Sequence, residues 1–179
     1  GETTDSRHDI PDMKKETLDK LQWEDVVITD IPAHKASPQM CEPNRITAQS
    51  HPVAVYNVAD SVYIYDMGGC STGFTEVIMP VMEEGKRIGL QYDDLYLKDM
   101  ADFHDGTYTD YYIGNGRTEG RFFSRFNYKA YRYLKIKGLP APLPLSDITR
   151  SSIRTDYESD ASFSCSDKDM NDIYQMVHK

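Results

Sequence analysis

The fold is decided by residues 121–140, which read RFFSRFNYKAYRYLKIKGLP. Aromatic and β-branched side chains are concentrated in this stretch, and such residues favour strands over helices. Two strands are predicted, one over 121–126 and one over 131–136. The stretch is therefore interpreted as two strands of a β-sandwich.

The second of these strands also predicts which side chains form the core. Side chains of a regular strand alternate between its two faces. Leu134 and Ile136 should therefore lie on one face with Arg132, and the opposite face should carry Tyr131, Tyr133 and Lys135. We expect the face that carries Leu134 and Ile136 to be buried, because it holds the aliphatic side chains.

The rest of the chain repeats the rhythm of short apolar runs separated by turn residues. Further strands are predicted over 23–31, around Ile46, over 53–58, 62–65, 74–79, 87–92, 107–113 and 147–155, with a turn at Asn115-Gly116. Strands at this spacing without helices between them are typical of a β-sandwich. The predicted fold is all-β, a jelly-roll-like antiparallel β-sandwich with a short C-terminal α-helix.

That helix is predicted because the period of the apolar residues changes near the end of the chain. Ser166 can cap a helix, with Asp169 completing a weak capping box and Cys165 and Met170 placed as a hydrophobic staple. One apolar stripe follows at helical spacing, formed by Met170, Ile173, Tyr174 and Val177. A single helix of this length is marginal in water, so we expect the stripe to contact the sandwich or another domain.

Composition excludes several functions. The net charge of −9 is unsuited to nucleic acid, whose recognition needs a basic surface. No apolar run approaches the roughly 20 residues of a membrane helix. The three cysteines, Cys41, Cys70 and Cys165, have no paired spacing, so we expect free and mostly buried thiols and no metal site.

Several stretches resemble the concanavalin-like β-sandwich domain of bacterial α-L-rhamnosidases. They are Asp66-Met-Gly68 with Gly73, residues 106–113, residues 126–133, which resemble a family pattern F-x-Y-x-x-F-R-Y, and Phe163-Ser-Cys-Ser166 with Asn171 and Ile173. The chain departs from the family at Gly69-Cys70, where a polar pair is usual, and at Tyr131, where Phe is usual. The resemblance implies that the catalytic carboxylates lie in a helical barrel outside this chain, so that no catalytic residue is carried over.

The candidate binding residues lie in and after an acidic loop with Asp93, Asp94, Asp99, Asp102 and Asp105. Their spacing fails the twelve-residue calcium loop, and a solvated loop is the simplest interpretation. A sugar or calcium contact is the alternative; no other cofactor is expected. Exposed tyrosines can stack on sugar rings, although strand tyrosines usually fill a core. The candidate carbohydrate contacts are Asp102, Asp105 and Tyr108.

The residue pattern and the resemblance together divide the chain into three parts. They are a polar tail or short helix at 1–22, the β-sandwich at 23–160, and the first helix of a truncated catalytic domain at 161–179. The predicted function is a non-catalytic domain of a glycoside hydrolase that supports a helical catalytic domain and shapes its sugar cleft. The expected partners are that domain and a rhamnose-containing carbohydrate, with no nucleic acid and no membrane.

Two other functions are compatible with the same residues. One is a carbohydrate-binding module that recognises a polysaccharide directly. The other is a protein-interaction domain that uses a tyrosine-rich face. Periplasmic, extracellular and cytoplasmic locations are all compatible with the sequence.

Overall fold

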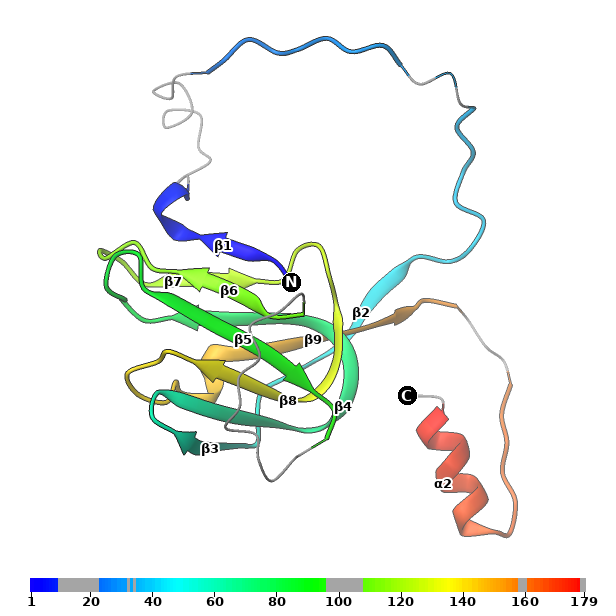
Figure 1. Ribbon diagram of the computed structural model, residues 1–179. Helices are drawn as coiled ribbons and strands as arrows, with labels where there is room; N and C mark the ends of the chain where they lie inside the picture. Colours follow the sequence, from blue (N-terminus) through cyan, green and yellow to red (C-terminus); the bar gives the residue numbers. More distant parts are fainter. Residues whose placement is uncertain (10–22, 32, 34, 96–107, 158–160, 178–179) are drawn as a thin grey trace.

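The computed structural model describes residues 1–9, 23–31, 33, 35–95, 108–157 and 161–177 of the chain. Figure 1 shows a curled assembly of strands and a C-terminal helix. The elements are β1 (Thr3–Asp5), η1 (Ser6–His8), β2 (Asn44–Ser50), β3 (Ala54–Ala59), β4 (Val62–Met79), β5 (Arg87–Asp93), β6 (Asp110–Ile113), β7 (Gly120–Phe123), β8 (Lys129–Lys137), η2 (Leu145–Asp147), β9 (Ile148–Thr155) and α2 (Lys168–Val177). The all-β sandwich and its C-terminal helix are confirmed.

The strands form a curled sheet in the order β1-β6-β5-β8-β4-β9-β2, with β3 and β7 added along β4. The long strand β4 joins the two halves of the sandwich. Its first part, 62–66, pairs with β3 and β8, and the pairing with β8 resumes over 71–73. Its last part, 73–79, pairs with β9 and β7. All pairings are antiparallel except that of β1 with β6, which is parallel.

The chain bends within β4 at the motif Asp66-Met-Gly68. Gly68 has φ of +77°, a left-handed conformation that glycine adopts without strain. Between Asp66 and Ser71 the register of β4 against β8 shifts, so that four residues of β4 oppose only Arg132 of β8. Such a bulge interrupts the ladder and increases the local bend. The bend carries β4 from one half of the sandwich to the other.

A buried arginine bonds to main-chain groups at this bend. Nη1 of Arg150 in β9 donates to the carbonyl oxygens of Gly69, at 2.8 Å, and Tyr131, at 3.0 Å. The Tyr131 hydroxyl lies 2.8 Å from the Thr75 hydroxyl on the returning half of β4. Buried carbonyl groups need such partners, so Arg150 ties the bulge to the neighbouring strand.

One apolar core lies between the two halves. Its buried side chains come from both ends of β4, from β5, β6, β7, β8 and β9, and from the loops after β4 and β8: Tyr63, Tyr65, Met67, Val77, Met79, Met82, Ile88, Leu90, Tyr112, Phe122, Tyr131, Leu134, Ile136, Leu139, Leu143 and Ile148. The predicted burial of Leu134 and Ile136 is confirmed.

The predicted alternation along β8 holds only in part. Tyr131 belongs to the same core as Leu134, although a regular strand would place the two on opposite faces. Arg132 and Tyr133 share the other side, where the guanidinium lies 5.0 Å from the centre of the Tyr133 ring. The register shift at Arg132 is the physical reason, because an irregular residue resets the alternation.

The strand predicted over 23–31 is wrong for this chain, because these residues lie in no strand and their aliphatic side chains are exposed. The N-terminal strand of the sheet is instead β1, within the stretch predicted as a tail or short helix; residues 10–22 lie outside the described residues. The backbone N–H of Glu2 donates to the Asp110 carboxylate at 2.8 Å. Residues 1–5 are thereby attached to β6 through both main chain and side chain.

The predicted C-terminal helix is confirmed, but its cap is Asp167 and not Ser166. Oδ1 of Asp167 accepts hydrogen bonds from the backbone N–H groups of Asp169 and Met170, as an N-cap residue does. The side chain of Asn171 instead secures Cys165, through bonds to its backbone N–H and carbonyl. The three cysteines are free, as predicted, but all are exposed, so the prediction that most are buried is wrong.

Candidate functional site

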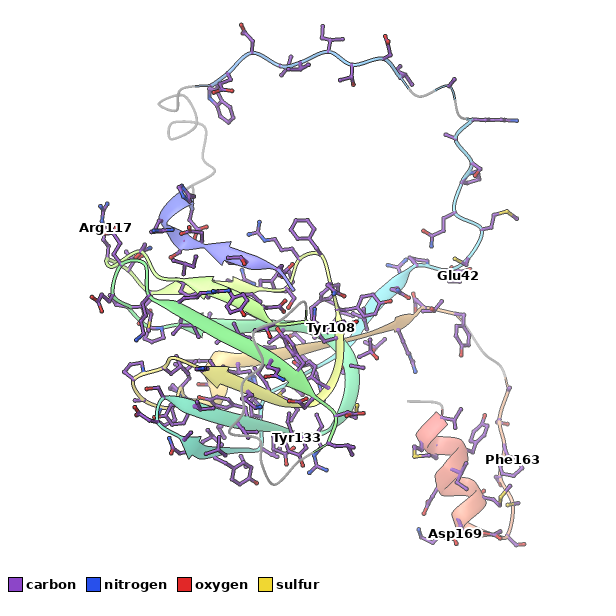
Figure 2. The ribbon with its side chains drawn as sticks, in the orientation of Figure 1. Glu42, Tyr108, Arg117, Tyr133, Phe163 and Asp169 are labelled. Carbon is purple, nitrogen blue, oxygen red and sulfur yellow. The ribbon has the colours of Figure 1, made fainter. Side chains whose placement is uncertain are left out.

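Of the predicted carbohydrate contacts, the structure describes Tyr108. Its ring is 80% exposed and stands just before β6, at the position labelled in Figure 2. Asp102 and Asp105 lie outside the described residues, as does Asp99. An exposed tyrosine ring offers the flat apolar face on which a sugar can stack. Sugar contact at Tyr108 stays a prediction.

An ion pair joins two of the stretches that carry the family resemblance, Asp66-Met-Gly68 and residues 126–133. Nε and Nη2 of Arg132 donate to the two carboxylate oxygens of Asp66, each at 2.9 Å. Oδ1 of Asp66 also accepts the backbone N–H of Gly68 at 2.8 Å. These bonds, first among them that from Arg132, lower the pKa of Asp66 below its usual range. The carboxylate therefore holds the bend of β4 against the bulge of β8.

Gly73, which follows Asp66-Met-Gly68 in β4, is needed for steric reasons. A Cβ atom on Gly73 would lie 2.4 Å from the carbonyl oxygen of Ser151 on β9. Only a residue without a side chain lets β4 and β9 approach so closely at this point. Asp66, Gly68, Gly73 and Arg132 thus all serve the junction between the two halves of the sandwich.

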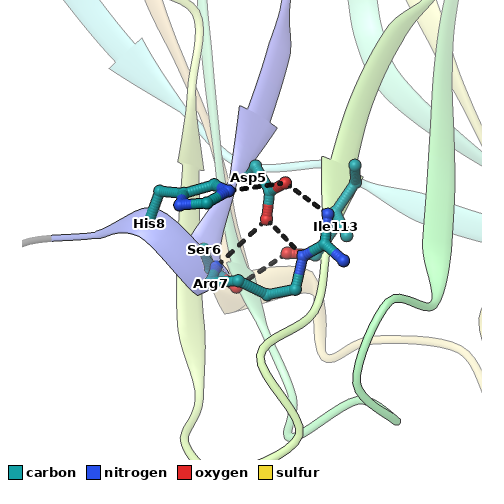
Figure 3. A network of polar contacts seen from close by, with 5 residues as sticks. All are labelled: Asp5, Ser6, Arg7, His8 and Ile113. Carbon is teal, nitrogen blue, oxygen red and sulfur yellow. Dashed lines mark hydrogen bonds and ion pairs between the residues drawn. The ribbon is translucent and has the colours of Figure 1, made fainter.

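A second carboxylate is held in the same way at the N-terminal edge. Figure 3 shows Asp5 accepting from the backbone N–H and the guanidinium of Arg7, while the Ser6 hydroxyl donates to the carbonyl of Ile113. The Arg7 hydrogen bond is the main cause that lowers the pKa of Asp5 to about 2. His8 lies 3.8 Å from the same carboxylate.

An open hollow of about 1290 Å³ lies beside this edge. Its walls come from η1 and the residue after it, from the loops between β4 and β5 and between β6 and β7, and from β7 and the residues after it. They carry charges of both signs: Arg7, Arg117, Arg121 and Arg125 with Asp9, Glu84 and Glu119. Arg121 is paired with Glu76 at 2.5 Å. Charges of both signs around an open hollow suit a polar partner surface better than an apolar small molecule.

A buried polar cluster lies under the same edge, and sequence patterns did not indicate it. Asp110 and Ser124 are buried beside the Tyr92 hydroxyl, and burial, followed by the Asp110 charge, raises the pKa of Tyr92 well above its usual range. The ammonium group of Lys129 lies 3.8 Å from Asp110. The cluster joins residues from four separate stretches of chain. Because it is closed to solvent, it is not an open ligand site.

The C-terminal helix presents an exposed apolar stripe. Met170 and Ile173 are each half exposed, and Met176 and Val177 are more exposed still. Tyr174 is held locally, because its hydroxyl donates to the Ala161 carbonyl at 2.9 Å and its ring packs on Phe163. No residue of α2 is buried. The structure therefore forms the predicted stripe without covering it.

Across the described ranges, no group of three or more His, Cys, Asp or Glu side chains is placed to hold a metal ion. Within those ranges, no helix combines the length and the apolar composition that a membrane crossing demands. Most of the acidic loop for which calcium was considered lies outside them, so calcium binding there stays a prediction.

Comparison with known proteins assigns this architecture. A family model described as the bacterial alpha-L-rhamnosidase concanavalin-like domain matches residues 56–154, from β3 to β9. This span contains the motif residues Asp66, Gly73 and Arg132. The fold and its central junction thus define a β-sandwich domain of the kind found in glycoside hydrolases. The chain belongs to the bacterial α-L-rhamnosidase concanavalin-like domain family.

Individual relatives cover more of the chain than the family model does. An α-L-rhamnosidase of Formosa agariphila is 24% identical over 187 residues, which span 99% of this chain and 19% of the relative. The structure of an α-L-rhamnosidase from Dictyoglumus thermophilum has a TM-score of 0.79 and 28% identity, covering 96% of this chain and 20% of that one.

A further structure shares the fold alone. The Streptomyces avermitilis α-L-rhamnosidase complexed with L-rhamnose has a TM-score of 0.65 and 19% identity, covering 78% of this chain and 14% of that one. The chain therefore spans about a fifth or less of the length of these relatives.

Proposed function

We propose that this domain is a non-catalytic part of an α-L-rhamnosidase, in which it supports a helical catalytic domain. Family membership supports α-L-rhamnosidase activity for the whole enzyme. The supporting role of this domain is inferred from the small share of its relatives' length that the chain covers. The chain matches nearly all of itself to relatives named α-L-rhamnosidase, yet it accounts for only 19–20% of the first two of them. Most of such an enzyme, including room for a separate catalytic domain, lies outside the matched region.

The chemistry of the held carboxylates also supports a non-catalytic role. Glycoside hydrolysis needs a general acid that is still protonated near neutral pH, together with a second carboxylate across the sugar. Asp5 and Asp66 have lowered pKa values because arginines bind them, so both are ionised at neutral pH. They suit structural ion pairs and not proton donation to a leaving group.

The exposed stripe of α2 supports a helical partner. Met170, Ile173 and Val177 follow the i, i+3, i+7 spacing by which one helix packs on another. The stripe is at least half exposed here, and burying one such side chain stabilises a protein by about 1.5–3 kcal/mol. In the parent enzyme the stripe would pack against the helices of the catalytic domain.

The supporting role is tested by an activity comparison. The purified 179-residue chain and a polypeptide of its relatives' length are each incubated with an aryl α-L-rhamnoside, and phenol release is followed. We expect turnover by the longer polypeptide alone. Turnover by the 179-residue chain would overturn the non-catalytic role, provided that a substitution in this chain abolishes it.

The α2 interface is tested in the same longer polypeptide. Ile173→Asp should lower its melting temperature and activity, whereas Lys168→Asp, at the exposed start of the same helix, should change neither by much. Equal effects of the two substitutions would contradict packing through the stripe. In the 179-residue chain both variants should melt like the wild type, because α2 buries no residue there.

Direct recognition of a carbohydrate is the second candidate function, and the exposure of Tyr108 favours it. The other interaction surface considered, a tyrosine-rich face, loses support because many strand tyrosines are core residues. Sugar binding by the domain is measured by titrating the chain with L-rhamnose and following tyrosine fluorescence or NMR shifts. Tyr108→Ala should abolish any binding, whereas Tyr157→Ala, at a similarly exposed tyrosine, should leave it unchanged.

A further inference from the structure

Residues 23–31 combine strand-forming composition with almost complete exposure. The segment reads WEDVVITDI, and Val26, Val27, Ile28 and Ile31 are between 86% and 92% exposed. Figure 1 shows it as an extended trace standing clear of the sandwich. Scattered apolar residues on a surface need no explanation, but a run of this kind marks an interaction site.

The pattern within the run indicates the kind of partner. Val26 and Ile28 occupy one face of an extended chain, and Val27 and Ile31 occupy the other. A strand at the surface of a sheet alternates apolar with polar residues, whereas a strand covered on both faces is apolar throughout. The segment therefore requires a position that is buried on both sides.

Among the described residues, the edge strand β2, which follows the segment in the chain, does not offer such a position. β2 pairs with β9 on one side and ends the strand order on the other. Six of the seven residues of β2 are exposed, and Ile46 is its one large aliphatic side chain. Pairing with β2 would satisfy backbone groups, but it would leave the valine and isoleucine side chains in water.

We propose that residues 23–31 form a β-strand by adding to a sheet of another domain in the same polypeptide. This inference rests on the proposed function, because it places the receiving sheet, apart from the helical catalytic domain, in the four-fifths of the relatives' length that this chain does not span. The partner is an open sheet edge with apolar cover on both faces, as in β-strand addition. The uncharged stretch from 26 to 29 is flanked by charged residues, Glu24 and Asp25 before it and Asp30 after it. Pro32 follows in the sequence, and proline does not continue a central strand, so the strand is bounded on both sides.

Hydrogen exchange tests the proposal directly. Exchange of the amides of residues 26–31 is measured by mass spectrometry in the 179-residue chain and in a polypeptide of its relatives' length. We expect fast exchange in the shorter chain and at least about tenfold slower exchange in the longer one. Fast exchange in both would overturn the proposal. Slow exchange in the shorter chain would also overturn it, by showing that this chain or a second copy supplies the partner.

Substitutions on the two faces give a second readout. Val27→Lys and Ile28→Lys should each lower the melting temperature of the longer polypeptide by several degrees. Met40→Lys is the matched control, since Met40 lies in the same connection and is 97% exposed, and it should have no effect. None of the three should shift the melting temperature of the 179-residue chain. Losses that are equal for all three in the longer polypeptide would contradict a strand buried on both faces.

The same samples separate this inference from the proposed function. Aryl α-L-rhamnoside turnover is assayed on the longer polypeptide before exchange is measured. An active polypeptide with an unprotected segment refutes strand addition alone. An inactive but folded polypeptide with a protected segment refutes the parent activity and upholds strand addition.

Discussion

Leu134→Ala is the sharpest test of the core. Leu134 is fully buried in β8 between Tyr65 of β4 and Tyr92 of β5. The substitution removes three carbon atoms, whose transfer from water is worth about 2.4 kcal/mol at roughly 0.8 kcal/mol each. The cavity adds to this, because Tyr65 is fixed by the hydrogen bond that its hydroxyl accepts from the Leu143 N–H at 2.7 Å. We expect a loss of about 3–5 kcal/mol in the free energy of unfolding.

Chemical denaturation and thermal melting both measure this loss. For a chain of this size the expected loss lowers the melting temperature by roughly 6–20 °C. Leu95→Ala is the matched control, because the same atoms are removed from a side chain that is 65% exposed. If the two variants lose the same stability, Leu134 does not face the core, and the register of β8 against β4 and β5 is wrong.

Three further outcomes are expected. Gly73→Ala should destabilise the domain in a urea titration, because the added Cβ would lie 2.4 Å from a main-chain carbonyl oxygen. Gly69→Ala is the control and should be neutral or slightly stabilising, because a Cβ there has no atom within 4 Å. A larger loss of stability for Gly69→Ala than for Gly73→Ala would contradict the close approach of β4 and β9. The pKa of Asp66 is lowered in the folded state by Arg132, so its contribution to stability is present above the unfolded pKa of about 3.9 and is lost as the pH falls through the lower folded value. The difference in unfolding free energy between wild type and Asp66→Asn should therefore shrink below pH 4, and a difference that stays constant from pH 7 to pH 2.5 would show that the ion pair does not depress this pKa. Removing residues 161–179 should leave the melting temperature of this chain unchanged, because α2 buries none of its residues; a clear decrease would show that the helix packs on the sandwich.

The junction of Asp66 and Arg132 explains why the sequence resemblance was informative. The two residues lie 66 positions apart in the sequence, and their bidentate contact holds the bend of β4 to the bulge of β8. The departures at Gly69-Cys70 and Tyr131 lie at the same bend. Tyr131 uses its hydroxyl to reach Thr75, and Cys70 is exposed, so neither departure disturbs the fold.

Local patterns failed where a strand depended on a distant partner. Residues 23–31 have the composition of a strand, yet a strand exists only where another edge completes its ladder, and the described chain supplies none to them. Residues 3–5 have weak strand composition, yet they form β1 because β6 and the Asp110 carboxylate receive them. Propensity describes the segment alone, whereas strand formation is a property of the pair.

The sequence by itself determined the all-β class, the burial of Leu134 and Ile136, the amphipathic C-terminal helix and the resemblance to α-L-rhamnosidases. Each of these follows from residues close together in the chain, whose spacing records which face is apolar. Only the tertiary structure decided the 18-residue span of β4, the bulge opposite Arg132, the place of Tyr131 in the core and the buried cluster of Tyr92, Asp110 and Ser124. These features join residues far apart in the sequence. The periodicity of one strand does not determine the register or the irregularities of the strand that pairs with it.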